Sequence, residues 1–339
     1  MAYVLGIDIG ASAVKVAMRR YTADGWSEVR RLPAPRPPAY DPIRRVGDEA
    51  GILAGRTPEP AHSLVAGLVR SIVDTAWRRE DGPPERVVLT HPTGWGTYRR
   101  GLLNRALCDA ELPGVTLLPA ALAVAAGAGA AGRLPAGGLV AVHRIGGLGV
   151  ESSVLDLAGP GDLRLLGAAE LDGAGGADLD DAVLARIMAV AGPDAEAPAA
   201  RNCTAAREGL SAAAEVVVDV PAPRAPLRGI RVRLTRADLR RLARPVLGAG
   251  VDLLLRAVHA AGAHPYDLAA VLLAGGAAGT PALADLIGEV VPAPVHREDD
   301  PQLAVAAGAT VSPAPASARA ADARGGVPDD RELVLEGRP

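Results

Sequence analysis

The chain has 339 residues, of which 49% are apolar, and a formal net charge of −3. This length exceeds what one hydrophobic core usually supports and predicts two lobes, and so small a net charge argues against nucleic acid as a partner. Aromatic residues make up 2% of the chain and phenylalanine is absent, so we expect cores built from Leu, Val, Ala and Ile.

The chain carries no sequence signal for secretion or for a membrane. Its two cysteines, Cys108 and Cys203, are too few for a disulfide framework and lack metal-site spacing, which suits a reducing compartment. The N-terminus runs directly into residues 4–9, Val-Leu-Gly-Ile-Asp-Ile, without the pattern of a signal peptide. The longest apolar stretch, residues 120–131, is rich in Ala and Gly and too short to span a bilayer. We therefore expect a cytoplasmic protein that does not bind a membrane.

The first half of the chain alternates strand and helix patterns. Runs of β-branched or apolar residues predict strands, and apolar residues three and four apart predict helices. The expected elements are strands at 3–9, 13–19 and 26–31, a helix at 62–79, a strand at 86–90, a helix at 97–110, a strand at 115–118 and an Ala-rich helix after it. The Pro-rich residues 33–60 are expected to be irregular. This alternation is typical of an α/β protein with a mixed or parallel sheet.

The second half repeats this order. The expected elements are strands at 139–145, 150–157 and 163–168, helices at 178–191 and 201–212, strands at 215–220 and 230–234, a helix at 236–261, a strand at 270–274, a helix after the glycines at 275–276 and an Ala-rich helix near 301–310. Thr235 and Asp238 should cap the helix that begins at residue 236. Three strands followed by helices thus occur twice, which predicts a structural duplication. The composition of residues 312–339 predicts a disordered tail.

Three glycine-rich turns each follow a predicted strand. They contain Gly10 and Ser12 in the first turn, Gly146 and Gly147 in the second, and Gly275 and Gly276 in the third. Glycines let backbone N–H groups approach an anion and form concave nests that bind phosphate. Any one of these turns is also what a hairpin requires, but all three in this order predict a phosphate site. Asp8 ends the first strand, where it would either meet a magnesium ion through water or cap its own hairpin.

Several stretches carry a family resemblance. Residues 6–10, Gly-Ile-Asp-Ile-Gly, resemble the first phosphate hairpin of the actin, hexokinase and DnaK-type ATPases. The stretches that narrow the resemblance to the DnaK-type, or 70-kilodalton heat-shock, family are 87–92 with 98–100, 175–180, 206–211, 272–276 with 280–281, and 300–309. The likeness covers residues 3–311, and the chain resembles short actinobacterial members without the peptide-binding half.

The resemblance implies an actin-like ATPase fold, in which two duplicated mixed-sheet lobes surround a nucleotide cleft. The lobes are expected at 1–167 and 168–311, with the last helix returning to the first lobe. ATP or ADP with Mg²⁺ would be the cofactors, and Asp8 would serve as both catalytic and metal-binding residue. The resemblance assigns nucleotide contacts to Gly175 and Gly176 at a helix start, and to Arg207 and Ser211 on the adenosine-contacting helix. From its sequence position alone, Arg207 is equally a solvated helix arginine.

The chain departs from the family pattern at positions that bind the metal ion and the nucleotide in that family. The second phosphate motif of the family has an acid where this chain has Arg144, a threonine where it has Gly149, and a second acid where it has Glu151. A glutamate that organises the metal and the attacking water is matched by Ala120, and an arginine that packs on adenine by Gly279. Arg144 either marks a site that has drifted or neutralises phosphate charge in place of magnesium. The family lysine near the attacking water should lie close to residues 43–44.

These observations favour a DnaK-like, actin-fold nucleotide-binding protein with a chaperone-like or regulatory role. Phosphoryl transfer depends on metal positioning and electrostatic stabilisation, so the lost acids predict weak ATP binding and degenerate hydrolysis, as in a pseudo-ATPase. Two alternatives stay open: an active magnesium-dependent ATPase or molecular chaperone with an altered metal shell, and a nucleotide-free actin-like scaffold. The expected partner is an unidentified protein.

Overall fold

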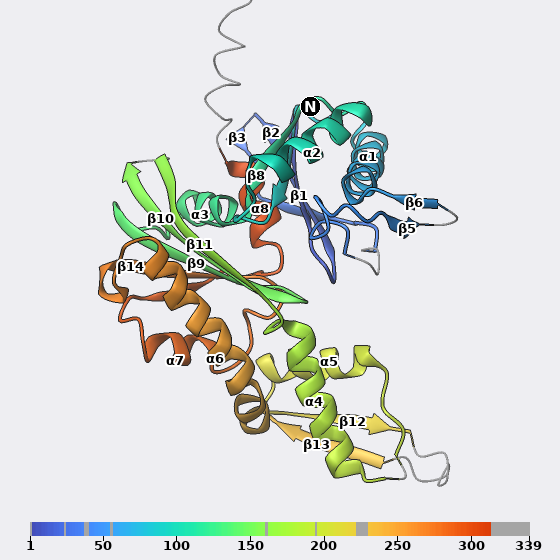
Figure 1. The fold of residues 1–339 in the computed structure, drawn as a ribbon, viewed down its shortest axis with the longest axis vertical. Helices are drawn as coiled ribbons and strands as arrows, with labels where there is room; N and C mark the ends of the chain where they lie inside the picture. The colour runs from blue at the N-terminus through green and yellow to red at the C-terminus, as the bar shows by residue number, and fades with distance from the viewer. Residues whose placement is uncertain are drawn as a thin grey trace, which may run out of the picture.

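The computed structural model describes residues 2–23, 25–36, 41–54, 57–159, 162–193, 195–221 and 230–312. Its first sheet comes from the N-terminal part of the chain (Figure 1). The strands are β1 (Tyr3–Ile9), β2 (Val14–Thr22), β3 (Gly25–Trp26), β4 (Arg30–Leu32), β7 (Arg86–His91) and β8 (Val115–Pro119). Their order is β3-β2-β1-β7-β8, with β4 paired to β2. β2 runs antiparallel to β1, and β7 and β8 continue the sheet in parallel.

The second sheet has the same construction. Its strands are β9 (Gly138–Ile145), β10 (Gly149–Gly159), β11 (Asp162–Asp172), β14 (Leu268–Ala274) and β15 (Val295–Arg297), in the order β11-β10-β9-β14-β15. Here too an antiparallel meander is extended by two parallel strands, since β14 pairs with β9 and β15 with β14. The expected duplication is therefore present at the level of strand order.

Helices separate and cover the two sheets. On the first sheet, α1 (Ala61–Glu80) and α2 (Thr97–Asp109) pack over one face in a core that includes Leu5, Ile7 and Leu103. Between the sheets lie α3 (Ala120–Ala130) and α8 (Ala304–Val311), whose alanines and valines pack on the β9 and β10 side chains that face them. The last helix lies against the N-terminal sheet, since α8 packs against β1 and β2.

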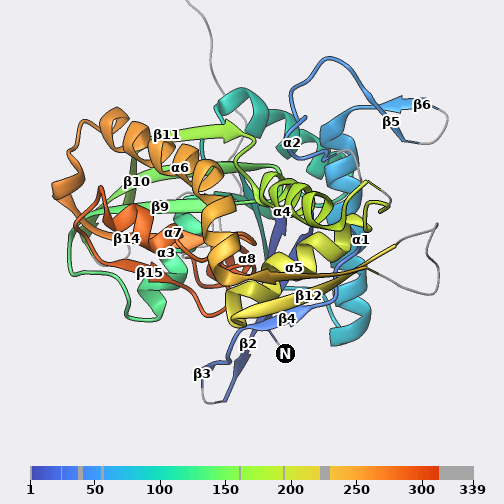
Figure 2. The ribbon, with the colours of Figure 1, turned by 90° about the horizontal axis from the view of Figure 1, so that it is seen from below.

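The other face of the second sheet is covered by α6 (Arg236–Ala260), which Figure 2 shows lying across it, and by α7 (Leu283–Gly288). A projecting part follows β11 and contains α4 (Gly176–Ala191), α5 (Ala200–Ala212) and the antiparallel pair β12 (Glu215–Val220) and β13 (Ile230–Thr235) (Figure 1). Thr235 caps α6 as predicted: its Oγ1 accepts a hydrogen bond from the Asp238 N–H at 3.1 Å. No helix among the described residues is long and apolar enough to cross a bilayer.

Small residues let the central elements approach one another. A Cβ atom built on Gly308 of α8 would overlap the carbonyl oxygen of Ala123 in α3, and one built on Gly127 would lie 3.1 Å from the Gly308 Cα. On the other side of α8, a Cβ on Gly6 of β1 would overlap the Ala306 carbonyl oxygen. The two helices that join the sheets therefore pack backbone against backbone.

The structure differs from the expected elements in a few places. The strand expected at 26–31 is two short strands, because β3 pairs with the end of β2 while β4 pairs further back along it. The region expected to be irregular contains the hairpin β5 (Ile52–Ala54) and β6 (Thr57–Glu59). Of the predicted tail, residues 313–339 lie outside the described residues.

The lobe boundary predicted between residues 167 and 168 falls inside β11. Strands β9 to β11 form one meander, and β9 pairs with β14, so the second sheet begins at Gly138. We therefore propose that the boundary between the lobes lies between α3 and β9.

Candidate functional site

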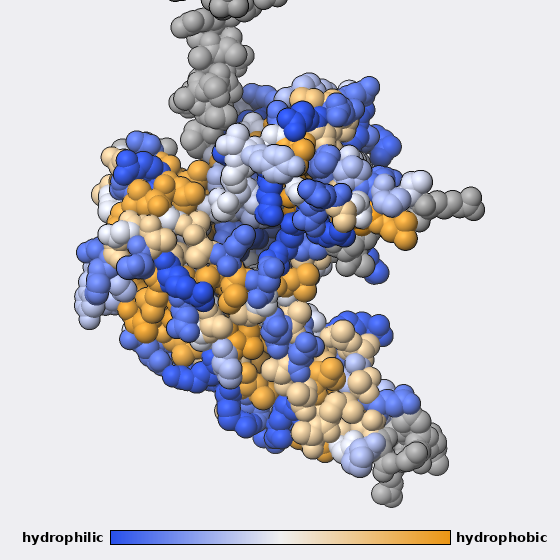
Figure 3. Space-filling view, viewed as in Figure 1, coloured by the Kyte–Doolittle hydropathy of each residue, from blue (hydrophilic) through white to orange (hydrophobic). Residues whose placement is uncertain are grey.

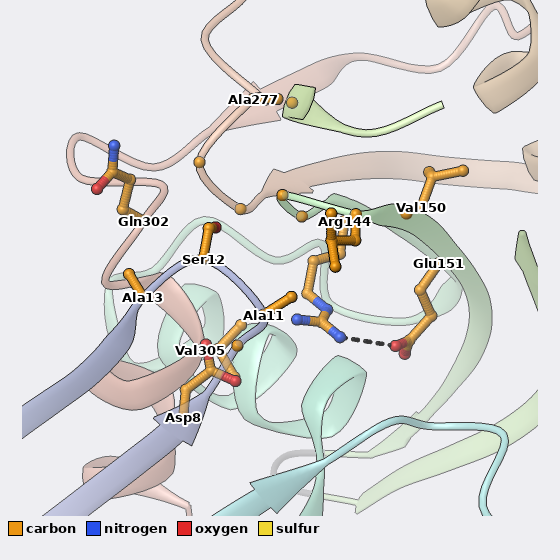
Figure 4. Close-up of a pocket in the computed structure, with 18 of the residues that line it drawn as sticks. Asp8, Ala11, Ser12, Ala13, Arg144, Val150, Glu151, Ala277, Gln302 and Val305 are labelled. Atoms are coloured by element: carbon orange, nitrogen blue, oxygen red, sulfur yellow. Dashed lines mark hydrogen bonds and ion pairs between the residues drawn. The ribbon is translucent and has the colours of Figure 1, made fainter. Parts of the chain in front are cut away.

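The three glycine turns line one cavity of about 460 Å³ between the two sheets. Figure 3 shows the surface hollowed between the N-terminal lobe and the projecting part, and Figure 4 shows lining residues in close-up. Of the predicted site residues, those on the cavity wall are Asp8, Gly10, Ser12, Gly146, Gly147, Gly176, Arg207, Gly275 and Gly276. Turns that lie far apart in the sequence thus meet because β1, β9 and β14 all end at this cavity.

The first and second turns touch. A Cβ atom built on Gly147 would lie 2.7 Å from the Cβ of Ser12, which is closer than real Cβ atoms approach. The second turn also anchors the start of α4, since the N–H groups of Gly176 and Ala177 donate to the carbonyls of Gly146 and Gly147 at 2.9 and 2.8 Å. Glycine is therefore required here by close backbone approach.

The third turn depends on the conformational freedom of Gly275. Its φ of +96° lies in the left-handed region, and a Cβ atom there would overlap the Ile145 carbonyl oxygen at the end of β9. The Ala277 N–H donates to that same carbonyl at 3.3 Å. The turn after β14 is thus held against the end of β9.

The backbone of these turns suits a phosphate. Within the described part of the chain, the N–H groups of Ala11, Ser12, Gly147 and Gly276 donate no hydrogen bond. These groups belong to turns on the cavity wall, and successive free N–H groups in glycine-rich turns form the concave nests that bind anions. The residues present therefore fit the phosphate chain of a nucleotide.

Asp8 ends β1 at the cavity and is 5% exposed. Its Oδ1 accepts a hydrogen bond from the Thr90 hydroxyl at 3.1 Å, and its Oδ2 lies 3.8 Å from the Lys15 ammonium. No hydrogen bond from its own hairpin to this carboxylate is found among the described residues, which disfavours the hairpin-cap alternative. Asp8 is thus a buried carboxylate with a hydroxyl and a cation as its neighbours.

Arg144 lies opposite Asp8 at the end of β9. Its Nη2 donates to the Glu151 Oε2 of the neighbouring strand at 3.0 Å, as drawn in Figure 4. The second carboxylate oxygen of Glu151 accepts the Thr93 N–H at 3.1 Å, and the Thr93 hydroxyl accepts the Ala121 N–H at the start of α3. Burial lowers the pKa of Arg144, but the carboxylates of Glu151 and Asp8 outweigh it and raise the pKa above its usual value. The cavity therefore contains a permanent cation.

Arg44 lines the cavity from the N-terminal lobe, at the sequence position predicted for the family lysine. Its Nη1 donates to the Leu148 carbonyl at 3.4 Å, and its Nη2 forms an ion pair with Asp172 at the end of β11. A Cβ atom built on Gly149 would lie 3.2 Å from the Arg44 Nη1. Arg44 thus connects the segment after β4 to the second glycine turn.

Arg207 faces the cavity from α5 and is only 5% exposed, which is inconsistent with a solvated helix arginine. Its Nε donates to Asp180 Oδ1 on α4 at 2.6 Å, and Asp180 Oδ2 accepts the Thr204 hydroxyl at 2.6 Å. At the start of α4, the Gly175 N–H donates to Asp178 Oδ2 at 2.9 Å, so Asp178 is engaged in capping. These bonds orient α4 and α5 around the cavity.

Ser211 does not line this cavity. It lies one turn after Arg207 on α5, and it borders a second cavity of about 280 Å³ together with Gly279, Thr280 and Arg297. The predicted adenosine contacts are therefore divided: Arg207 lies on the wall of the central cavity and Ser211 on the wall of its neighbour.

The described residues offer a magnesium ion few protein ligands. They contain no group of three or more His, Cys, Asp or Glu side chains that could hold a metal. Magnesium prefers several oxygen ligands in octahedral geometry, yet Glu151 is held by Arg144 and Thr93, and Asp180 by Arg207. Ala120, which matches the family glutamate, is 1% exposed and packs in the apolar cluster between the sheets. Arginine side chains therefore occupy the carboxylates that a metal ion would otherwise use.

Sequence reasoning missed two groups beside the site. Thr93 links Glu151 to α3, and the only feature of the sequence that could have indicated this role is its position just after a strand. Asp41 is 8% exposed and its Oδ1 has no hydrogen-bond partner among the described residues. Burial raises the pKa of Asp41, with Arg44 and Arg144 acting in the opposite direction. Asp41 thus sits near both cavity arginines, although no motif marks it.

Comparison with known proteins indicates the family of this chain. A family model described as Hsp70 protein matches residues 115–322. A chaperone protein HscA homologue of Acidithiobacillus ferrooxidans is 29% identical over 327 residues, which cover 90% of this chain and 50% of the relative. The corresponding homologue of Pseudomonas fluorescens is 28% identical over 310 residues, covering 87% and 47%. That of Bordetella pertussis is 32% identical over 233 residues, covering 66% and 36%.

The chain spans about half the length of the first curated relatives it matches. The match and the duplicated mixed sheets together confirm the predicted actin-like ATPase fold and the DnaK-type resemblance. On the evidence of the family model and of these relatives, the chain belongs to the Hsp70 family.

Proposed function

We propose that this protein is a nucleotide-binding module with a chaperone-like or regulatory role, which binds ATP or ADP weakly and hydrolyses ATP very slowly or not at all. The observation that carries the proposal is the meeting of three glycine turns at one cavity, with Ser12 against Gly147. The proposal also includes an unidentified protein partner and a cytoplasmic location, which rest on the family membership and on the sequence.

The low hydrolysis follows from the charges around Asp8. Catalysis of phosphoryl transfer depends on positioning and on electrostatic stabilisation, mainly by metal ions that bridge the phosphates. Here Asp8 faces Arg144, while Glu151 on the adjoining strand is held by that arginine. We expect turnover at least roughly a hundredfold slower than in a relative with an intact metal site, the usual scale for losing one electrostatic element.

An active magnesium-dependent ATPase would need a new metal shell. Glu151 and Asp178 are the nearest candidates, but Glu151 already accepts bonds from Arg144 and Thr93, and Asp178 caps the start of α4. A nucleotide-free scaffold would leave unexplained why the free N–H groups of Ser12 and Gly147 meet at one cavity. Both alternatives are outcomes of the test below.

Calorimetry of the full chain with ATP and with ADP, each in magnesium and in EDTA, tests binding, and a phosphate-release assay tests turnover. We expect measurable binding without magnesium and negligible phosphate release. Robust magnesium-dependent release that is lost in Asp8→Asn would establish the active ATPase instead. Absence of binding to either nucleotide in both conditions would support the scaffold.

A further inference from the structure

Two arginines flank the second glycine turn at the centre of the cavity. Arg144 precedes the turn at the end of β9, and Arg44 reaches the Leu148 carbonyl on the turn from the opposite lobe. Burial raises the pKa of the nearby Asp41 carboxyl group and both arginines act to lower it, so the two guanidinium groups lie close enough to act on one acid. The same small region therefore carries two guanidinium groups, with the carboxylates of Asp8, Asp41 and Glu151 beside them.

We propose that Arg144 and Arg44 take the place of a metal ion, so that the site binds the phosphate chain of a nucleoside di- or triphosphate in its magnesium-free form. This inference rests on the proposed nucleotide binding and specifies the ionic form of the nucleotide. Guanidinium groups suit such a role because they form paired, charge-assisted hydrogen bonds to phosphate oxygens and keep their charge.

Arg144 has donors left for a ligand. A guanidinium group offers five N–H donors, and the bond recorded for Arg144 is the one from Nη2 to Glu151. Its Nε is buried and has no hydrogen-bond partner in the described part of the chain. A buried donor without a partner costs free energy, which an arriving phosphate oxygen would recover. Figure 4 shows the Arg144 side chain extending toward the first turn, with Asp8 beyond it.

The bonds of Arg44 are exchangeable. Its partner Asp172 has a side chain that is 85% exposed, and ion pairs with such exposed groups contribute little stability. The bond from Nη1 to the Leu148 carbonyl is long, at 3.4 Å. Both contacts can therefore be released at small cost when an anion enters the cavity.

The charge balance decides which form of the nucleotide is preferred. Magnesium bound to the phosphate chain cancels two negative charges and occupies the oxygens that the arginines would contact. It also brings a cation toward Arg144, whose own positive charge would repel it even though the carboxylates of Glu151 and Asp8 lie nearby. Magnesium should therefore weaken binding here, whereas a metal-dependent site would require it.

The test is calorimetry of the full chain with ATP and ADP, in EDTA and in excess magnesium, for wild type and three variants. Wild type should bind each nucleotide more tightly in EDTA, by at least about threefold, because the ligand then carries its full charge. Arg144→Gln should weaken binding in EDTA by about tenfold or more, the usual result of losing a charged hydrogen bond. Glu151→Gln should strengthen it, because the competing carboxylate is neutralised while its oxygen can still accept the Thr93 N–H.

Arg164→Gln is the matched control: this arginine lies on β11 of the same sheet, its side chain is 71% exposed, and it should leave both affinities unchanged. Circular dichroism of each variant verifies folding. Tighter binding of wild type in magnesium, or equal affinities of Arg144→Gln and wild type, would overturn the arginine inference and leave nucleotide binding intact. Absence of wild-type binding in both conditions would overturn the proposed function as well, so the two failures are distinct.

Discussion

Ser12 and Gly147 meet across the boundary between the two sheets: a Cβ atom on Gly147 would lie 2.7 Å from the Ser12 Cβ. Ser12 follows β1 of the first sheet, and Gly147 follows β9 of the second. The cavity is closed at this point by direct contact between two turns. Its shape therefore depends on how the two sheets are placed, and any added side chain here must move one turn.

The first prediction concerns this contact. Gly147→Val should push the first and second turns apart and weaken ATP or ADP binding by about tenfold or more, because the phosphate nest no longer closes. Calorimetry in EDTA measures the effect. Gly248→Ala is the control, since a Cβ on this α6 glycine meets nothing within 4 Å. Unchanged affinity of Gly147→Val would show that the two turns do not act together on the nucleotide.

The second prediction concerns the crossing of α3 and α8. Gly308→Val should lower the free energy of unfolding by about 1–3 kcal/mol or more, because its side chain would overlap the Ala123 carbonyl and overpack the crossing. Urea denaturation measures this loss. Gly248→Ala should be neutral or stabilising by up to about 1 kcal/mol, since alanine is the better helix former. A Gly308→Val protein as stable as wild type would mean that the helices separate easily.

The third prediction concerns magnesium. Arg144→Asp replaces the cation that faces Asp8 by a second carboxylate, so the pair could share a magnesium ion. Nucleotide binding should then become tighter in magnesium than in EDTA, the reverse of wild type. Turnover should stay low, because Gly149 stands where the family pattern has a threonine and Ala120 where it has a glutamate. Calorimetry and phosphate release measure the two effects separately. A variant that binds no more tightly in magnesium than in EDTA would show that Asp8 is not positioned to share a metal.

The fourth prediction concerns His143, which is fully buried with its Nδ1 at 2.8 Å from the Ser152 Oγ. Burial lowers its pKa from 6.5 to about 4. At a pH between these two pKa values, His143 binds a proton in the unfolded chain but not in the folded chain. The free energy of unfolding should therefore fall as the pH drops from above 6.5 toward 4. The loss should reach about 3 kcal/mol.

The measurement is urea denaturation at pH 7, 5.5 and 4.5 for wild type and His143→Gln, which keeps a polar group for Ser152 but does not titrate. The variant should lose less stability over this range. His91, whose pKa is also lowered by burial, contributes equally to both proteins and cancels in the comparison. Parallel pH profiles would show that His143 is not buried in its neutral form.

Much of the fold follows from local sequence. Apolar runs such as β1 and β14, and the capped helix that begins after Thr235, carry their own periodicity and end signals, so their positions could be predicted. The repeated order of strands and helices likewise predicted two duplicated sheets. The lobe boundary that we propose between α3 and β9 depends instead on the pairing of β9 with β14, more than a hundred residues later in the chain, which no local pattern indicates.

The candidate site, too, was determined partly by local sequence and partly by the tertiary structure. The sequence alone determined that three glycine turns exist, that Asp8 ends the first strand, and that Arg144 replaces an acid of the family pattern. Only the tertiary structure decided that Ser12 touches Gly147, that Glu151 is held by Arg144 and Thr93, and that Ser211 borders a different cavity. A motif specifies backbone conformation and residue type through neighbours in the chain. The partner of a charged side chain is chosen by packing between distant segments, which no local pattern records.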